Sequence, residues 1–308
     1  MVIMDNIVSY INGNYKVILD LNDGTMIRCT MDNELKPKFP DSMDIKITNS
    51  CSVGCPWCHE QSVRNGEHGD ILSPSFIDKL HPYTSLAIGG GNILEHPDLL
   101  AFLEKCKVLK LVPSVTVNQI HFMENQQFIK KLVDDKLIYG LGVSLTKADT
   151  EFIDTIKQYP NAVVHTIAGI TTEENYKLLA NHGLKILILG YKTFGRGVRV
   201  LDNFAAAMVV NYQKEKLSEL LPQMIKDKWY KNISFDNLAL KQLDVKSLVS
   251  DALWKTFYMG EEGTTTMYVD MVKREFATNS ASAIRYPLLD NIEDMLDTIH
   301  HERGKRID

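Results

Sequence analysis

The sequence predicts an α/β fold, a parallel sheet that is open or closed into a barrel and is covered by helices. From residue 43 onward, short apolar runs alternate with helical patterns. The runs are continuously apolar, as in strands that are buried on both faces. Hydrophobic residues make up 44% of the 308 residues, which is enough for a large core. Right-handed crossovers between successive strands then give the sheet its order.

Six strand–helix units account for the middle of the chain. The strand-like segments are MDIKIT, SLAIGGG, PSVTVNQ, YGLGVSL, NAVVHTIAG and LKILILG. In the segment LSPSFIDKL, Ser73 as an N-cap and Pro74 at the first helical position predict a helix. In the next helix, Cys106 follows apolar residues at helical spacing, so we expect it in the core.

The two ends of the chain depart from this pattern. Residues 15–31 alternate around the turn signal NDG, which predicts a hairpin with Cys29 on its apolar face. After residue 200 we expect helices, a seventh strand near 231–240 and a strand or hairpin at 264–278. Both strand segments should lie at or beside the open edge of the sheet, since an exposed edge has unpaired backbone groups. The predicted divisions are an N-terminal hairpin (1–42), a core barrel (43–200) and a helical and strand extension that covers the barrel (201–308).

Charge and cysteine content exclude several classes of protein. The formal net charge is −5 with no long run of either sign, so we expect no nucleic-acid binding and no attraction to an anionic membrane. No apolar stretch is long enough to span a bilayer, and the N-terminus does not resemble a secretion signal. The five cysteines, with three of them clustered, favour a reducing compartment and a cytoplasmic location.

The clustered cysteines are Cys51, Cys55 and Cys58, in the stretch CSVGCPWCHE. Thiolates are soft ligands that select zinc, copper(I) or iron–sulfur clusters. A structural zinc site needs four ligands, and His59 directly follows Cys58, so a tight loop would have difficulty bringing both onto one ion. Three cysteines suit three corners of a cubane whose fourth iron stays open for a small ligand. Cys106 or a distant histidine could still close that position.

The C-x3-C-x2-C spacing, with Trp57 before the last cysteine and a strand before the first, resembles the radical S-adenosylmethionine (radical SAM) superfamily. The resemblance covers roughly residues 43–200. It implies a partial (β/α)6 TIM-like barrel, a [4Fe-4S] cluster on the three cysteines and S-adenosyl-L-methionine as cofactor. It also implies reductive cleavage of that cofactor to a 5′-deoxyadenosyl radical, which abstracts hydrogen from an unidentified peptide, nucleotide or small metabolite. A single-electron donor such as flavodoxin or ferredoxin would be the partner.

The resemblance also implies a set of cofactor-binding residues. GGGN matches the glycine-rich segment after the second strand, but Asn92 stands where the superfamily has glutamate, which puts an ionic contact to the cofactor ammonium in doubt. The expected cofactor contacts are Trp57, Gly89, Gly90, Gly91, Asn92, Asn118, Ser144, His165, Gly169, Ile170 and Tyr191.

Several polar residues have two interpretations. Asn118 and Ser144 either meet the cofactor or cap the segments that follow them. Lys192 and Arg196 are either anion ligands or solvated loop charges. His59 and His68 are expected to be loop hydrogen-bonders rather than ligands. Asp236 and Asp270 either contact substrate or lie on a wet face.

Three functions compete. The first is a catalyst acting on its own substrate, which the residues after the sixth strand favour because they leave room for an elaborated substrate site. The second is an activase that installs a glycyl radical in a partner enzyme. The third is a non-catalytic module with a structural metal or cluster, which requires a fourth protein ligand. The chain has no second cysteine cluster, unlike many peptide-modifying members of the superfamily.

Overall fold

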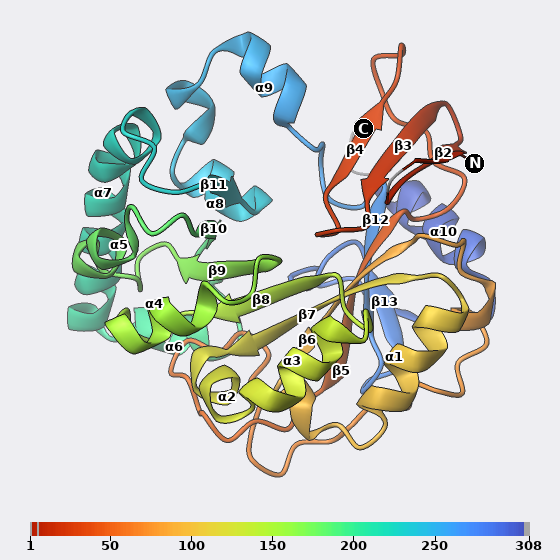
Figure 1. Cartoon of the computed structure of the whole chain (residues 1–308), viewed down its shortest axis with the longest axis horizontal. Coiled ribbons are helices and arrows are strands. Elements are labelled where there is room, and N and C mark those ends of the chain that lie inside the picture. Colours follow the sequence, from red (N-terminus) through yellow and green to blue (C-terminus); the bar gives the residue numbers. More distant parts are fainter. Residues whose placement is uncertain (1, 5, 305–308) are drawn as a thin grey trace.

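The computed structural model describes residues 2–4 and 6–304 and contains two β-sheets, with most of the helices arranged around the larger one (Figure 1). The strands are β1 (Val2–Met4), β2 (Ile7–Asn12), β3 (Tyr15–Asp20), β4 (Met26–Cys29), β5 (Ser42–Thr48), β6 (Ser85–Gly90), β7 (Val112–Asn118), β8 (Gly140–Ser144), β9 (Ala162–Ile167), β10 (Lys185–Leu189), β11 (Asn232–Phe235), β12 (Thr266–Asp270), β13 (Glu275–Ala277) and β14 (Tyr286–Pro287). The α-helices are α1 (Leu99–Val108), α2 (Gln119–Glu124), α3 (Gln126–Asp134), α4 (Thr150–Ile156), α5 (Glu173–Leu179), α6 (Arg196–Asp202), α7 (Phe204–Lys226), α8 (Asn237–Gln242), α9 (Asp251–Phe257) and α10 (Ile292–Gly304). Short 3₁₀ helices are η1 (Ile77–Lys79), η2 (Ile93–Glu95) and η3 (Val245–Leu248).

The larger sheet has the strand order β11-β10-β9-β8-β7-β6-β5-β12-β13-β14. Strands β5 to β11 run parallel in chain order, and β12 adds to β5 in parallel before the sheet ends in antiparallel β13 and β14. The predicted α/β fold with a large, mostly parallel sheet is therefore confirmed. The segments predicted to lie at the edges do so, because β11 borders the six core strands on one side and β12 on the other.

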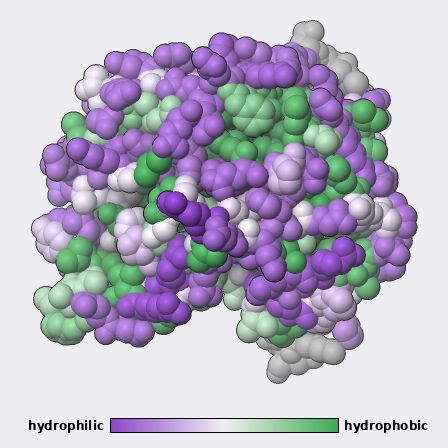
Figure 2. Space-filling view, turned by 90° about the horizontal axis from the view of Figure 1, so that it is seen from below, coloured by the Kyte–Doolittle hydropathy of each residue, from purple (hydrophilic) through white to green (hydrophobic). Residues whose placement is uncertain are grey.

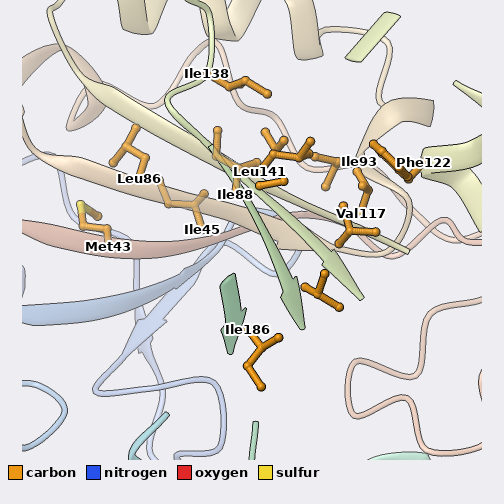
Figure 3. Close-up of a cluster of buried hydrophobic side chains, with 14 of the residues drawn as sticks. Met43, Ile45, Leu86, Ile88, Ile93, Val117, Phe122, Ile138, Leu141 and Ile186 are labelled. Carbon is orange, nitrogen blue, oxygen red and sulfur yellow. The ribbon is translucent and has the colours of Figure 1, made fainter. Parts of the chain in front are cut away.

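The two faces of the large sheet differ in chemistry. On β5, Met43, Ile45 and Ile47 are fully buried in the main core, together with the alternate residues of its neighbours. These side chains fill the space between the strands and the helices that cover the sheet (Figure 3). Because side chains alternate along a strand, Asp44 and Lys46 point to the opposite face. On β5 that inner face is therefore polar, whereas the helix-covered face is apolar.

The smaller sheet is antiparallel, in the order β1-β2-β3-β4. The predicted hairpin is its β3–β4 pair, and the sequence analysis missed the two strands before it. Tyr15, Val17 and Leu19 form its apolar face, which packs on Tyr83 and Val112 near the amino ends of β6 and β7. This sheet therefore covers the amino-terminal end of the large one.

The expectation for Cys29 was wrong, since its side chain is exposed. The register pairs Val17 with Arg28 and Lys16 with Cys29, so Arg28 lies on the buried face of β4. A shift of one residue exchanges the two faces of a strand, and the polar Arg28 concealed which face was inside. Asp41 pairs with Arg28 there. Asp41 is fully buried, and its carboxylate accepts a hydrogen bond from the Arg28 Nε at 2.9 Å.

Helix signals also failed at one segment. The segment starting at Ser73 and Pro74 forms only η1, not an α-helix. The backbone N–H groups of Leu72 and Ser73 bond instead to the Asp70 carboxylate, at 3.2 and 3.0 Å, which makes a turn that competes with helix formation.

Removal of the Asp41 carboxylate tests how strongly the small sheet is held. We expect Asp41→Ala to lower the free energy of unfolding by about 3–5 kcal/mol, because Arg28 would remain buried without its charged partner. Tyr15 would also lose the acceptor of its hydroxyl, which lies 2.6 Å from Asp41. Chemical denaturation followed by circular dichroism measures the change. The exposed Asp32→Ala is the control, and equal stability of the two variants would contradict the argument.

Candidate functional site

The predicted site residues gather at the carboxyl ends of the parallel strands. The strand register places Thr48 beside Gly90, Asn118 beside Ser144, and Ser144 beside His165. The cysteine loop follows β5 and lies at the same end of the sheet, at the bottom of Figure 1. Figure 2 looks onto this side of the molecule, where hydrophilic side chains surround separate hydrophobic areas. Carboxyl ends of parallel strands are where α/β proteins place their ligands.

The three clustered cysteines are free and half-buried on one loop without regular secondary structure. Burial raises the pKa of the Cys55 thiol, and the nearby Cys58 and Cys51 raise it further, so the three sulfur groups share one neighbourhood. Cys106 is fully buried in α1, as predicted. Among residues 2–4 and 6–304, no three His, Cys, Asp or Glu side chains are close enough to hold a single metal ion. By its chemistry this donor set matches a cubane, in which each thiolate would bind a different iron, whereas a structural zinc ion needs four ligands.

The glycine segment after β6 supports the first part of the cysteine loop. Gly91 donates its N–H to the Thr48 carbonyl at 2.7 Å, and Asn92 donates its N–H to the Ser50 carbonyl at 2.6 Å. Gly90 has φ +118°, and a Cβ there would lie 2.5 Å from the Thr48 oxygen. Glycine is therefore required by the approach of the chain to itself. At Gly89 nothing lies within 4 Å of an added Cβ, so that position faces open space.

Asn92 belongs to a small polar cluster that the sequence analysis missed. Its Oδ1 accepts a bond from the Leu94 N–H at 3.3 Å, and its Nδ2 donates to Glu95 at 3.0 Å. Ser50 donates its hydroxyl to the second oxygen of Glu95 at 2.7 Å. Burial would raise the pKa of Glu95, but the bonds from Ser50 and Asn92 outweigh it and lower the pKa. A carboxylate thus stands three residues after the position where the superfamily has glutamate.

The remaining predicted contacts fall into two groups. Asn118 caps α2, since its Oδ1 accepts the Ile120 N–H at 2.9 Å. Tyr191 is buried and donates its hydroxyl to the Gly197 carbonyl at 2.8 Å. Both side chains thus make internal hydrogen bonds. Half-buried members of the set are Trp57, Ser144, His165 and Ile170, and Gly169 is buried.

His165 lies on the inner face of β9, directly over a glycine of β8. A Cβ on Gly142 would come within 2.4 Å of the imidazole ring. Burial lowers the pKa of His165 to about 4. The imidazole is therefore neutral at pH 7.

A buried charge network links the cysteine loop to the last third of the chain. Lys46 is 5% exposed and lies 2.8 Å from Glu60 and 3.1 Å from Asp270 of β12. His59 lies 3.1 Å from Glu60 and 3.2 Å from Lys192. Asp270 and Lys192 thus bond to other residues of the protein. This differs from the interpretations that Asp270 lies on a wet face and that Lys192 is a solvated loop charge.

The histidines and the second carboxylate also have internal partners. His59 and His68 are hydrogen-bonded loop residues, as expected, with His68 bonded to Thr48 at 2.9 Å. Asp236 caps α8 through the Ala239 N–H at 2.7 Å. Each of these side chains has a hydrogen-bond partner within the fold, so none of them needs a bound ligand to satisfy its polar atoms.

Comparison with known proteins gives matches in sequence and in fold, although no protein-family model matches the chain. The probable dual-specificity RNA methyltransferases RlmN from two strains of Clostridium perfringens, SM101 and 13, are each 27% identical over 186 residues, which is 56% of this chain and 51% of theirs. The chain spans about half the length of these curated relatives.

Solved structures of SuiB from Streptococcus suis share the fold. SuiB bound to S-adenosylmethionine has a TM-score of 0.59 at 12% identity, covering 97% of this chain and 88% of SuiB. SuiB bound to the precursor peptide SuiA has a TM-score of 0.58 at 12% identity, covering 96% and 87%. At this identity the likeness concerns the fold.

The cysteine motif directly after the first core strand, the sequence match and the shared fold all support the resemblance to the radical SAM superfamily on which the sequence analysis relied. Within the described residues, no helix combines the length and apolarity needed to cross a membrane.

Proposed function

We propose that this chain reductively cleaves S-adenosyl-L-methionine at a [4Fe-4S] cluster held by Cys51, Cys55 and Cys58, and abstracts hydrogen from a substrate. The observation that carries the proposal is the donor set. Three thiols lie on one loop at the carboxyl ends of a parallel sheet, and among the described residues no three His, Cys, Asp or Glu side chains are grouped to hold a single ion. A cluster with one open iron needs this arrangement.

When bound, the cluster supplies the electron that splits the sulfonium into methionine and a 5′-deoxyadenosyl radical, and this radical takes a hydrogen atom from the substrate. The chain contributes position and exclusion of water. Gly89, with open space at its Cβ position, lets the methionine end approach the backbone. Asn92 and Glu95 supply acceptors for the ammonium group of the cofactor. Asn92 stands where the superfamily has glutamate, and the Glu95 carboxylate supplies the negative charge that Asn92 lacks. The other proposed contacts are Trp57, Gly90, Gly91, Asn118, Ser144, His165, Gly169, Ile170 and Tyr191.

We further propose that the sheet curls into a partial (β/α)6 barrel over residues 43–200, with the polar inner face of Asp44, Lys46 and His165 around the substrate. The N-terminal unit (1–42) and the C-terminal extension (201–308) would close it. The pairing of β12 with β5 and of β11 with β10 supports this role for the extension. A lid is needed because the radical reacts with almost any C–H bond.

The substrate class remains a peptide, a nucleotide or a small metabolite. RlmN is named as an RNA methyltransferase, and SuiB was solved with a precursor peptide. A flavodoxin or ferredoxin would donate the electron, in the cytoplasm. The activase alternative lacks a specific observation in its favour.

Anaerobic cleavage assays test the proposal. The protein reconstituted with iron and sulfide and reduced with dithionite should convert S-adenosylmethionine to methionine and 5′-deoxyadenosine, which liquid chromatography measures. Cys51→Ala, Cys55→Ala or Cys58→Ala should remove most of the cluster absorbance and all cleavage. The matched controls Cys29→Ala and Cys106→Ala should retain the cluster. A protein that binds the cofactor and never cleaves it would support the structural-module alternative instead.

Replacement of Asn92 tests the methionine end of the site. We expect Asn92→Leu to weaken cofactor binding by about 1–3 kcal/mol, the cost of leaving a buried polar group without its partner. Calorimetry on the anaerobic, cluster-loaded protein measures this affinity. Glu95→Gln is the companion variant, because it removes the charge and keeps the shape. Unchanged affinity in Asn92→Leu would assign Asn92 to capping η2 alone.

A further inference from the structure

Arg196 holds the cysteine loop from a distant part of the sequence. It is the first residue of α6, after β10. Its backbone N–H donates to the Cys58 carbonyl at 3.0 Å. Its guanidinium donates through Nε to the Cys55 carbonyl and through Nη1 to the Ser62 carbonyl, both at 2.9 Å. One residue therefore bonds to three carbonyls spread over the loop.

The residue before Arg196 lets the two segments come into backbone contact. Gly195 has φ +61°, and a Cβ there would lie 2.2 Å from the His59 carbonyl oxygen. No residue with a side chain fits this position without moving the cysteine loop. The approach brings the Arg196 side chain within reach of its two carbonyls.

Arginine suits this position for two reasons. Its planar guanidinium can donate to two separate carbonyls at once, whereas the ammonium of lysine is a single point on a flexible stem. Its charge is also fixed at every physiological pH. That charge lies at the carbonyl of a proposed ligand, Cys55. From there it would attract the negative charge that a cluster gains on reduction. Charge and hydrogen bonds around a cluster set its reduction potential.

We propose that Arg196 is a positioning residue for the cluster loop: its guanidinium bridges the Cys55 and Ser62 carbonyls, and its positive charge makes the bound cluster easier to reduce. This inference rests on the proposed function, because it assumes a cluster on the three cysteines. It gives the charge of the β10–α6 connection a role other than binding a phosphate or carboxylate.

The first test uses the protein without iron. Hydrogen exchange of residues 51–62, followed by mass spectrometry, should be at least tenfold faster in Arg196→Gln and in Arg196→Lys than in the wild type. Arg199→Gln is the matched control, since Arg199 is exposed on the same helix. Thermal melts report whether each variant is folded. Wild-type exchange rates in Arg196→Gln would overturn the bridging role, with no cluster required.

The second test is the midpoint potential of the reconstituted cluster, from a titration followed by electron paramagnetic resonance. Arg196→Gln should lower the reduced-to-oxidised ratio at a fixed potential by about tenfold, which is 59 mV for one electron. Arg196→Lys, which keeps the charge, should stay within about twofold of wild type. An unshifted potential in Arg196→Gln would overturn the electrostatic role. If Arg196→Gln takes up no cluster, the exchange rates decide the bridging role, and an Arg196→Lys ratio that departs from wild type by more than twofold would overturn the electrostatic role. Failure of the wild type to assemble a cluster would refute the proposed function, and the iron-free measurement would still report on Arg196.

Discussion

The backbone contact between the glycine segment and the end of β5 is the constraint on which the site depends. The cysteine loop has no regular secondary structure, so its polar backbone groups need partners from other elements. Gly91 and Asn92 donate to the carbonyls of Thr48 and Ser50, directly before the first cysteine. Because a Cβ at Gly90 would overlap the Thr48 oxygen, this contact requires glycine. The glycine-rich motif therefore fixes where the cysteine loop begins, in addition to the role in cofactor binding that we propose for it.

The inner face of the sheet carries charges that are costly to bury unless they are paired. Lys46 is held between Glu60 of the cysteine loop and Asp270 of β12, which offsets the cost of removing all three from water. This ties the loop that would bind the cluster to a strand more than two hundred residues later in the chain. The last third of the chain is thus joined to the site by an ion pair as well as by strand pairing. Substitutions in β12 should therefore affect the position of the cysteine loop.

The sequence predicted the features that depend on local pattern. The six core strands were recognisable because each is a short apolar run, and the cysteines because their spacing is specific. Features that depend on distant partners were missed. The register of β4 decided that Arg28, and not Cys29, is buried. Glu95 was missed because the Ser50 hydroxyl that it accepts from is brought near only by the fold. Arg196 was expected to be an anion ligand or a solvated charge, because the Cys55 and Ser62 carbonyls are likewise distant in the sequence. Lys46 gave a weak local signal, because it stands between Ile45 and Ile47 in an apolar strand. A lysine in such a strand indicates a buried acidic partner.

The central claim is that three thiolates hold a cluster whose fourth iron is open to S-adenosylmethionine. Electron paramagnetic resonance of the reduced, reconstituted protein, with and without the cofactor, tests it most directly. Direct binding of the cofactor to an open iron changes the electronic symmetry of the cluster, so we predict that its g-values shift when the cofactor is added. A spectrum that stays unchanged at saturating cofactor would contradict the claim, since it would mean that the cofactor does not reach the iron.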